Sequence, residues 1–383
     1  MSRKVLLLAV VLLLSSVDGK QQVSVVAVDV MWNYLGLSPL GKAEGKRQLE
    51  SACSRGFNKI RMAMMPFWPD QMKSHYLQNK SWYWSQVDEM VADAKQHNCQ
   101  IIPSLFWNWF SLADATYTPL GDGMRNLSSP LALASIEYIE EIASRYSNDS
   151  NVIAYWELGN ELNLIADLNL TQQQPQVHPS LGTPTKRTQR DNFSTDDMIA
   201  WETFLVNTIM EYDIVRPFRG VSTGHSVPRD DAEHLRRSYH DPRRDWTKDT
   251  VAEFKKNLKD TCKCCTHCSV HVYGGPGMIR WSNTNASYPV VMHPAAEVAY
   301  EGGKLLYLGE FGDPLPGPRP FSHTMLDLIP TLPHASTTLP LATIWVWEFY
   351  QDSKTQPANF SLIPGRDDAM IHRMEAFNNQ SSW

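Results

Sequence analysis

The chain has 383 residues, of which 43% are hydrophobic and 20% charged, a composition typical of a globular protein with a large core. Its formal net charge of −6 comes without any run of Lys or Arg, which argues against nucleic acid as a partner. The length suits one large α/β domain or two ordinary ones.

The N-terminus has the organisation of a secretory signal peptide. Arg3 and Lys4 precede an apolar run over residues 5–14, and small residues follow up to Gly19. The apolar run is too short to span a membrane, although a retained N-terminal anchor is the alternative. We therefore expect residues 1–19 to be removed and the remaining chain, 20–383, to be secreted to the extracellular space without a membrane partner.

Glycosylation sequons and cysteines agree with export. Asn-x-Ser/Thr sequons, each a candidate glycosylation site, occur at Asn79, Asn126, Asn148, Asn169, Asn192, Asn285, Asn359 and Asn379. The six cysteines suit an oxidising compartment, and we expect disulfides whose connectivity the sequence leaves open. The crowded cysteines, with His267, also allow a zinc site; they are Cys262, Cys264, Cys265 and Cys268.

Strand-like and helix-like segments alternate along the chain. The expected strands are Val23–Val30, Asn58–Ala63, Gln100–Phe106, Val152–Leu158, Gly220–Thr223, Ser269–Val272, Leu305–Gly309 and Ala342–Trp347. The expected helices include Lys42–Arg55, Tyr83–Gln96, Asp249–Lys259 and Pro294–Gly302, with further helices beginning near Pro130 and at a Ser194–Asp197 capping box. Eight strands alternating with helices predict a single-domain α/β fold, a (β/α)8 TIM barrel.

The longest stretch without periodicity, residues 162–193, directly follows the fourth expected strand. In a barrel it would be a loop insertion on the catalytic face, where long loops shape a binding cleft. A glycosylated excursion without fixed structure is the alternative for its middle portion.

Polar and aromatic residues gather where the expected strands end, which is where a barrel places its active site. Carboxylates end two of these strands close to glycine: Glu161 on the fourth and Glu310 on the seventh. Two carboxylates are the minimum equipment for cleaving a glycosidic bond. The other strand ends provide Arg61, the segment Trp107-Asn108-Trp109, Asn160, His225, His271, Tyr273 and Trp347.

This ordered set resembles the clan A glycoside hydrolases, and Gly56 to Arg61 is similar to the second strand of glycoside hydrolase family 5. The resemblance spans nearly the whole chain after the signal peptide. It rests on Asn-Glu ending strand four, Gly-Glu-Phe-Gly ending strand seven, His-x-Tyr on strand six and a Trp on strand eight.

The resemblance implies a role for each residue. Glu161 would be the general acid/base, and Glu310 the ionised nucleophile of a retaining reaction, with the carboxyl groups about 5–5.5 Å apart. Arg61 and Tyr273 would keep Glu310 charged. Sugar-binding roles fall to Asn160 at the 2-hydroxyl, to His271 beside the catalytic pair and to Trp347 as a platform, with Trp107, Asn108, Trp109 and His225 as further candidates. Glu157 is expected to be a buried structural acid.

The substrate is open at this stage. Trp156 to Glu161 is similar to a segment of many β-mannanases, which favours endo-β-1,4-mannanase over endo-β-1,4-glucanase or another β-glycosidase. A catalytically inactive, secreted glycan-binding barrel is the alternative from a different class. The chemistry needs no cofactor and no metal, and we expect a monomer whose partner is a β-linked polysaccharide or oligosaccharide.

Overall fold

The computed structural model describes residues 26–29, 41–147, 151–216, 218–273, 281–282, 287–313, 320–333, 342–347 and 361–380. The predicted signal peptide lies outside these ranges, and so do the sequons at Asn148, Asn285 and Asn359. Within them, no helix combines the length and the hydropathy that a membrane span requires.

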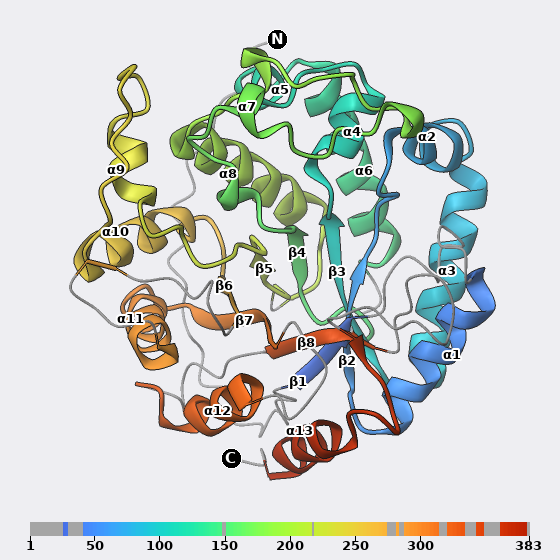
Figure 1. Ribbon diagram of the computed structural model, residues 1–383. Coiled ribbons are helices and arrows are strands. Elements are labelled where there is room, and N and C mark those ends of the chain that lie inside the picture. The colour runs from blue at the N-terminus through green and yellow to red at the C-terminus, as the bar shows by residue number, and fades with distance from the viewer. Residues whose placement is uncertain are drawn as a thin grey trace.

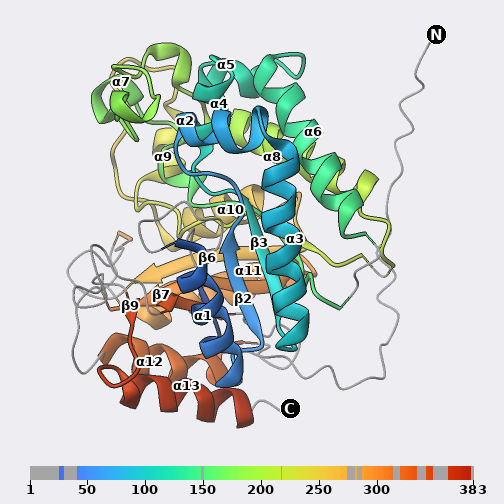
Figure 2. The same cartoon turned by 90° about the vertical axis from the view of Figure 1, so that its right-hand side faces the viewer.

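A curled parallel sheet forms the centre of the molecule, and helices surround it (Figures 1 and 2). Strands pair with their neighbours in chain order, and β1 pairs with both β2 and β8. The strands are β1 (Val26–Asp29), β2 (Lys59–Ala63), β3 (Gln100–Phe106), β4 (Trp156–Gly159), β5 (Val221–Ser222), β6 (His267–Tyr273), β7 (Leu305–Gly312), β8 (Ala342–Trp347) and β9 (Ser361–Leu362).

Helices follow the strands, as the alternating pattern predicts. They are α1 (Gly41–Ser54), α2 (Pro69–Gln71), α3 (Lys80–Gln96), α4 (Trp109–Ala115), α5 (Leu120–Arg125), α6 (Pro130–Arg145), α7 (Leu170–Gln173), α8 (Thr195–Tyr212), α9 (Ala232–Arg237), α10 (Val251–Thr261), α11 (Tyr288–Glu301), α12 (Pro320–Leu328) and α13 (Asp368–Gln380). A π-helical turn, Met72–Leu77, leads into α3. The α2, α4, α5 and α7 helices lie together at one end of the molecule (Figure 2).

Capping residues explain several helix boundaries. Ser194 accepts a hydrogen bond from the Asp197 amide at 3.0 Å, so the predicted capping box at the start of α8 is confirmed. The expected start of α11 at Pro294 is wrong. The helix begins at Tyr288, because Pro289 occupies its first turn and Pro294 lies inside the helix.

Most of the hydrophobic core lies in one large cluster of side chains from the strands and the helices around them. A smaller cluster forms separately from Ile102, Tyr155 and Tyr307. Tyr307 is paired with Ser269 in the sheet, so it shares a face with Ser269 and with His271 two residues further along β6. This face leads to the strand ends where the candidate catalytic residues lie.

Candidate active site

The predicted residues of four strands meet at the C-terminal end of the sheet. Arg61 comes from β2, and Asn160 and Glu161 directly follow β4. His271 and Tyr273 come from β6, and Glu310 comes from β7. One ligand atom each of Glu161, His271 and Glu310 lies within 4.8 Å of the others, so segments far apart in the chain converge on one small volume.

Arg61 connects the members of this group. Its side chain is fully buried, and its Nε and Nη2 donate to Glu157 at 2.8–3.1 Å. Nη1 donates to Glu310 Oε1 at 2.5 Å, and Nη2 also donates to Asn160 Oδ1 at 2.9 Å. The guanidinium carbon lies 4.4 Å from the centre of the Trp107 ring. Arg61 therefore fixes both the predicted nucleophile and the neighbour of the predicted acid/base.

Glu310 is held in its ionised form. The Tyr273 hydroxyl donates to Glu310 Oε2 at 2.5 Å, and Arg61 holds the other oxygen. Burial on its own raises the pKa of Glu310, but the charges of His271 and Arg61 and the two hydrogen bonds outweigh it and leave the pKa lowered. The same contacts act on His271. Burial lowers the pKa of His271, but Glu310 and Glu161 reverse this and leave it raised.

A β-bulge directs Glu310 into the site. Leu308 pairs with Val270, but the next pair along is His271 with Glu310, so Gly309 is the extra residue. Because of this insertion Glu310 shares a face with Tyr307 and His271; in regular pairing it would face the other way. A Cβ on Gly309 would lie 2.5 Å from His271 Nε2, which explains why glycine occupies the bulge.

Glu161 has a left-handed backbone, with φ of 52°, which is costly for a residue other than glycine. Its amide donates to the Gly224 carbonyl at 2.9 Å, which holds this conformation. One carboxylate oxygen is 3.0 Å from His271 Nδ1, and 27% of the side chain is exposed. Glu161 is therefore fixed at its backbone while its carboxyl group remains accessible.

A pocket of about 210 Å³ adjoins Glu161. The residues that line it are Phe67, Trp107, Asn108, Trp109, Phe110, Asn160, Glu161, Leu162, Leu164, Ile165, Pro175 and Gln176. The segment Trp107 to Trp109 thus lies where the sequence predicts it. However, the Asn108 side chain caps α4, because its Oδ1 accepts the Phe110 amide, and its Nδ2 donates to Phe67 O. Trp109 Nε1 donates to Asn160 O. These two residues support the pocket wall.

Two candidate residues are not shown to join either the pocket lining or the group around Glu310. His225 is 2% exposed, and its Nε2 lies 2.6 Å from Glu202 on α8, so the structure does not bring it to the pocket. The reason is that His225 follows Gly224, whose positive φ of 72° redirects the chain after β5. The Trp347 side chain lies outside the described residues, although its backbone ends β8 and pairs with Leu362.

Four cysteines form disulfides, as expected from the sequence. Cys53 pairs with Cys99, and Cys262 pairs with Cys268. This second bond removes two thiols from the zinc site considered as the alternative. Cys264 and Cys265 are free thiols with their sulfur atoms 3.6 Å apart, and burial raises the pKa of Cys265 well above its usual value.

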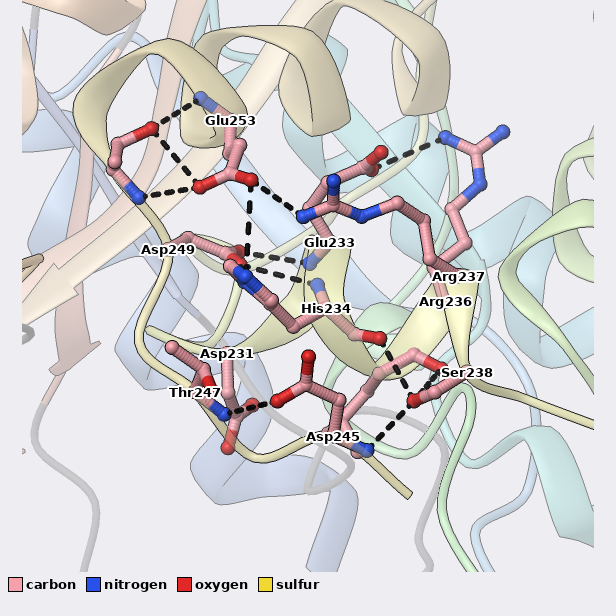
Figure 3. Close-up of polar contacts among 12 residues, drawn as sticks. Asp231, Glu233, His234, Arg236, Arg237, Ser238, Asp245, Thr247, Asp249 and Glu253 are labelled. Atoms are coloured by element: carbon pink, nitrogen blue, oxygen red, sulfur yellow. Dashed lines mark hydrogen bonds and ion pairs between the residues drawn. The ribbon is translucent and has the colours of Figure 1, made fainter. Parts of the chain in front are cut away.

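A second group of titratable residues lies outside the pocket, where α9 meets α10 (Figure 3). His234 Nδ1 is 2.6 Å from Asp249, and Asp249 also accepts the backbone amides of Glu233 and His234. Glu253 accepts the Thr250 amide at the start of α10. Because the Asp249 oxygens already accept hydrogen bonds from backbone amides, we interpret this cluster as a structural contact that joins the two helices.

No family model and no curated protein matches this chain at the sequence level. Solved structures do match it. An endo-β-1,4-mannanase from Thermotoga petrophila aligns with a TM-score of 0.61 and 13% identity over 94% of this chain and 78% of its own. A glycoside hydrolase family 5 mannosidase from Rhizomucor miehei has a TM-score of 0.56, 12% identity and 93% coverage of both chains. XacCel5A in complex with cellopentaose has a TM-score of 0.55 and 11% identity, covering 93% of this chain and 99% of its own.

At these identities the likeness establishes the fold. The chain has the fold of family 5 glycoside hydrolases, in agreement with the resemblance found in its sequence. Sequence reasoning identified the strand-end residues and expected residues 162–193 to shape the cleft, but it missed the Gly309 bulge and did not single out Pro175 and Gln176 within that segment. A glycine directly before a strand-end glutamate is the signal that indicates a bulge; the wall residues have no comparable signal.

Proposed function

We propose that this protein is a secreted, retaining β-glycoside hydrolase of the family 5 type that cleaves β-1,4-mannan internally. The observation that carries the proposal is the arrangement of Glu161 and Glu310, whose closest oxygens lie within 4.8 Å, around His271. This spacing fits the shorter carboxyl separation of retaining enzymes, since inverting enzymes need about 6.5–9.5 Å to admit a water molecule.

In this mechanism Glu161 protonates the glycosidic oxygen while Glu310 attacks the anomeric carbon and forms a covalent glycosyl-enzyme. The partly exposed Glu161 then removes a proton from water, which hydrolyses the intermediate. Arg61 and Tyr273 keep Glu310 ionised before the attack. Asn160 accepts from Arg61 through Oδ1. Its amide nitrogen makes no hydrogen bond to the residues that the structure describes and would donate to a sugar hydroxyl.

Mannan is preferred because the sequence from Trp156 to Glu161 is mannanase-like and because the similar structures include an endo-β-1,4-mannanase and a mannosidase. An endo-β-1,4-glucanase is the second candidate, supported by the likeness to XacCel5A, which was solved with cellopentaose. We further propose a complete (β/α)8 barrel over residues 20–383, export through the 1–19 signal peptide and action as a monomer without a cofactor.

The test is product analysis on mannan, galactomannan, glucomannan and carboxymethyl cellulose, with wild-type protein and Glu310→Gln. We expect short manno-oligosaccharides from the wild type and a loss of activity by several orders of magnitude in the variant, with unchanged circular dichroism. Glucan-derived products alone would favour the glucanase. If the wild type binds these glycans but releases no sugar from any of them, the inactive glycan-binding barrel replaces the hydrolase.

A further inference from the structure

The segment between β4 and α8, expected from the sequence to shape a cleft, forms one wall of the active-site pocket. Leu162, Leu164 and Ile165 begin this wall, and Pro175 and Gln176 complete it. Trp107, Asn160 and Glu161 line the same pocket. Residues on this wall therefore line the same small pocket as Glu161, whose carboxyl group would protonate the glycosidic bond.

Two glutamines at this wall have backbones that favour glycine. Gln174 has a φ of 46° and Gln176 a φ of 52°, both in the left-handed region, and they flank Pro175. Non-glycine residues adopt this conformation only where the surrounding structure enforces it. At Gln174 this conformation ends α7, because its amide donates to Leu170 O. At Gln176, which follows the helix end, contacts from outside the segment are needed to hold the conformation.

Arg187 imposes it. Its side chain is buried, and Nε donates to Pro175 O at 2.9 Å while Nη2 donates to Gln176 O at 2.9 Å. The other donors reach both carboxylate oxygens of Asp114 on α4, at 2.7 and 2.9 Å. The guanidinium also lies 3.9 Å from the centre of the Phe110 ring, another pocket residue. One buried cation thus ties the two wall residues to α4.

The two glutamines differ in what their side chains do. Gln174 is committed to the protein, because its Oε1 accepts the Arg187 amide at 2.8 Å and its Nε2 donates to Thr171 O at 2.5 Å. Gln176 is exposed, and its carboxamide makes no hydrogen bond within the part of the chain that the structure describes. A carboxamide offers both a donor and an acceptor, the combination that matches a pair of neighbouring sugar hydroxyls.

We propose that Gln176 is a substrate-binding residue that hydrogen-bonds a sugar unit next to the cleaved bond, and that Arg187 is its positioning residue. The inference rests on the proposed function, since the ligand is the glycan that Glu161 and Glu310 would cleave. The buried Arg187–Asp114 pair fixes the backbone that carries the Gln176 carboxamide at the pocket, which lowers the backbone entropy lost when a sugar binds.

The decisive variant is Gln176→Gly, because glycine adopts the same backbone without strain while the carboxamide is lost. We expect the thermal unfolding temperature to stay at or above that of the wild type. With β-1,4-mannopentaose as substrate, KM should rise about tenfold, equivalent to about 1.4 kcal/mol, with little change in kcat. Tyr117→Gly is the matched control, since Tyr117 has a φ of 54° but does not line this pocket. It should leave KM unchanged.

The role of Arg187 is tested with Arg187→Met alone and combined with Gln176→Gly. The single variant should raise KM, and the combined variant should have the KM of Gln176→Gly alone, because Arg187 acts through Gln176. A folded Gln176→Gly protein with wild-type KM overturns the proposal even if Arg187→Met fails to fold. If the wild type cleaves no glycan, the proposed function fails. The inference about Gln176 is then tested by calorimetric binding of mannopentaose and cellopentaose to the wild type and to Gln176→Gly. Equal affinity of the two proteins, or no binding, overturns the inference.

Discussion

Removing the Tyr273 hydroxyl should shift the pH dependence of the enzyme in a predictable direction. The hydroxyl donates to Glu310 Oε2 at 2.5 Å and is among the contacts that lower the pKa of Glu310. In Tyr273→Phe the charged form loses this donor, so the pKa of Glu310 must rise. In the proposed reaction Glu310 acts only when it is ionised, so the acid limb of the pH profile should move to higher pH.

The magnitude follows from the strength of the lost contact. A hydrogen bond to a charged acceptor contributes about 1.5–3 kcal/mol, and about 1.36 kcal/mol corresponds to one pKa unit. The acid limb should move upward by about 1–2 pH units, with Arg61 and His271 still holding the pKa below that of an unpaired buried carboxyl group.

The assay is kcat/KM for a soluble manno-oligosaccharide across the acidic range, since this ratio reports the ionisation of the free enzyme. Tyr307→Phe is the control. Tyr307 is also buried and lies on the same strand as Glu310, but its ring packs against Tyr155. The reasoning is refuted if the acid limb of Tyr273→Phe stays at the wild-type position or moves to lower pH while that of the control is unchanged.

Three further outcomes follow from the structure. Glu157→Gln removes the carboxylate 2.8 Å from buried Arg61, which keeps Glu310 as a charged partner, so unfolding in urea should show a loss of at most about 3 kcal/mol together with lower activity. Replacing Cys53 and Cys99 by alanine removes a bond across 46 residues and should cost about 4 kcal/mol in the same assay, with kcat retained. Gly309→Ala places a methyl group 2.5 Å from His271 Nε2. We expect a large loss of activity and only a small decrease in the unfolding temperature.

The sequence predicted the parts of the fold that depend on periodicity. β3 and β8 have the predicted bounds, and both strands consist largely of apolar residues. β4 is shorter than expected: the chain from Val152 reaches the sheet only through a bridge at Ile153 before the strand begins at Trp156. Neighbouring strands decide this pairing, and a single segment carries no information about their register.

The residues of the candidate site were predictable from the positions of the strands, but the directions of side chains beyond the strands were not. Strand ends identify Arg61, Glu161, His271 and Glu310, since each follows directly from the position of a strand. The direction of a side chain after a left-handed residue does not follow from position, so His225 turns to Glu202. The wall residue Gln176 depends on a buried arginine more distant in the chain, a contact that no local pattern indicates.

In the proposed reaction Glu310 must be both ionised and reactive, and Glu157 offers a reason why it can be both. If Arg61 bound Glu310 alone, the full positive charge would stabilise the carboxylate and reduce its tendency to attack carbon. Arg61 instead directs two of its nitrogens to Glu157 and only Nη1 to Glu310, so Glu157 takes up much of the cation's charge. Tyr273 and His271 add to the contact with Arg61, and together the three lower the pKa of Glu310. Glu157→Gln should therefore leave Glu310 ionised but slow the formation of the glycosyl-enzyme, which pre-steady-state kinetics with an activated aryl glycoside would measure.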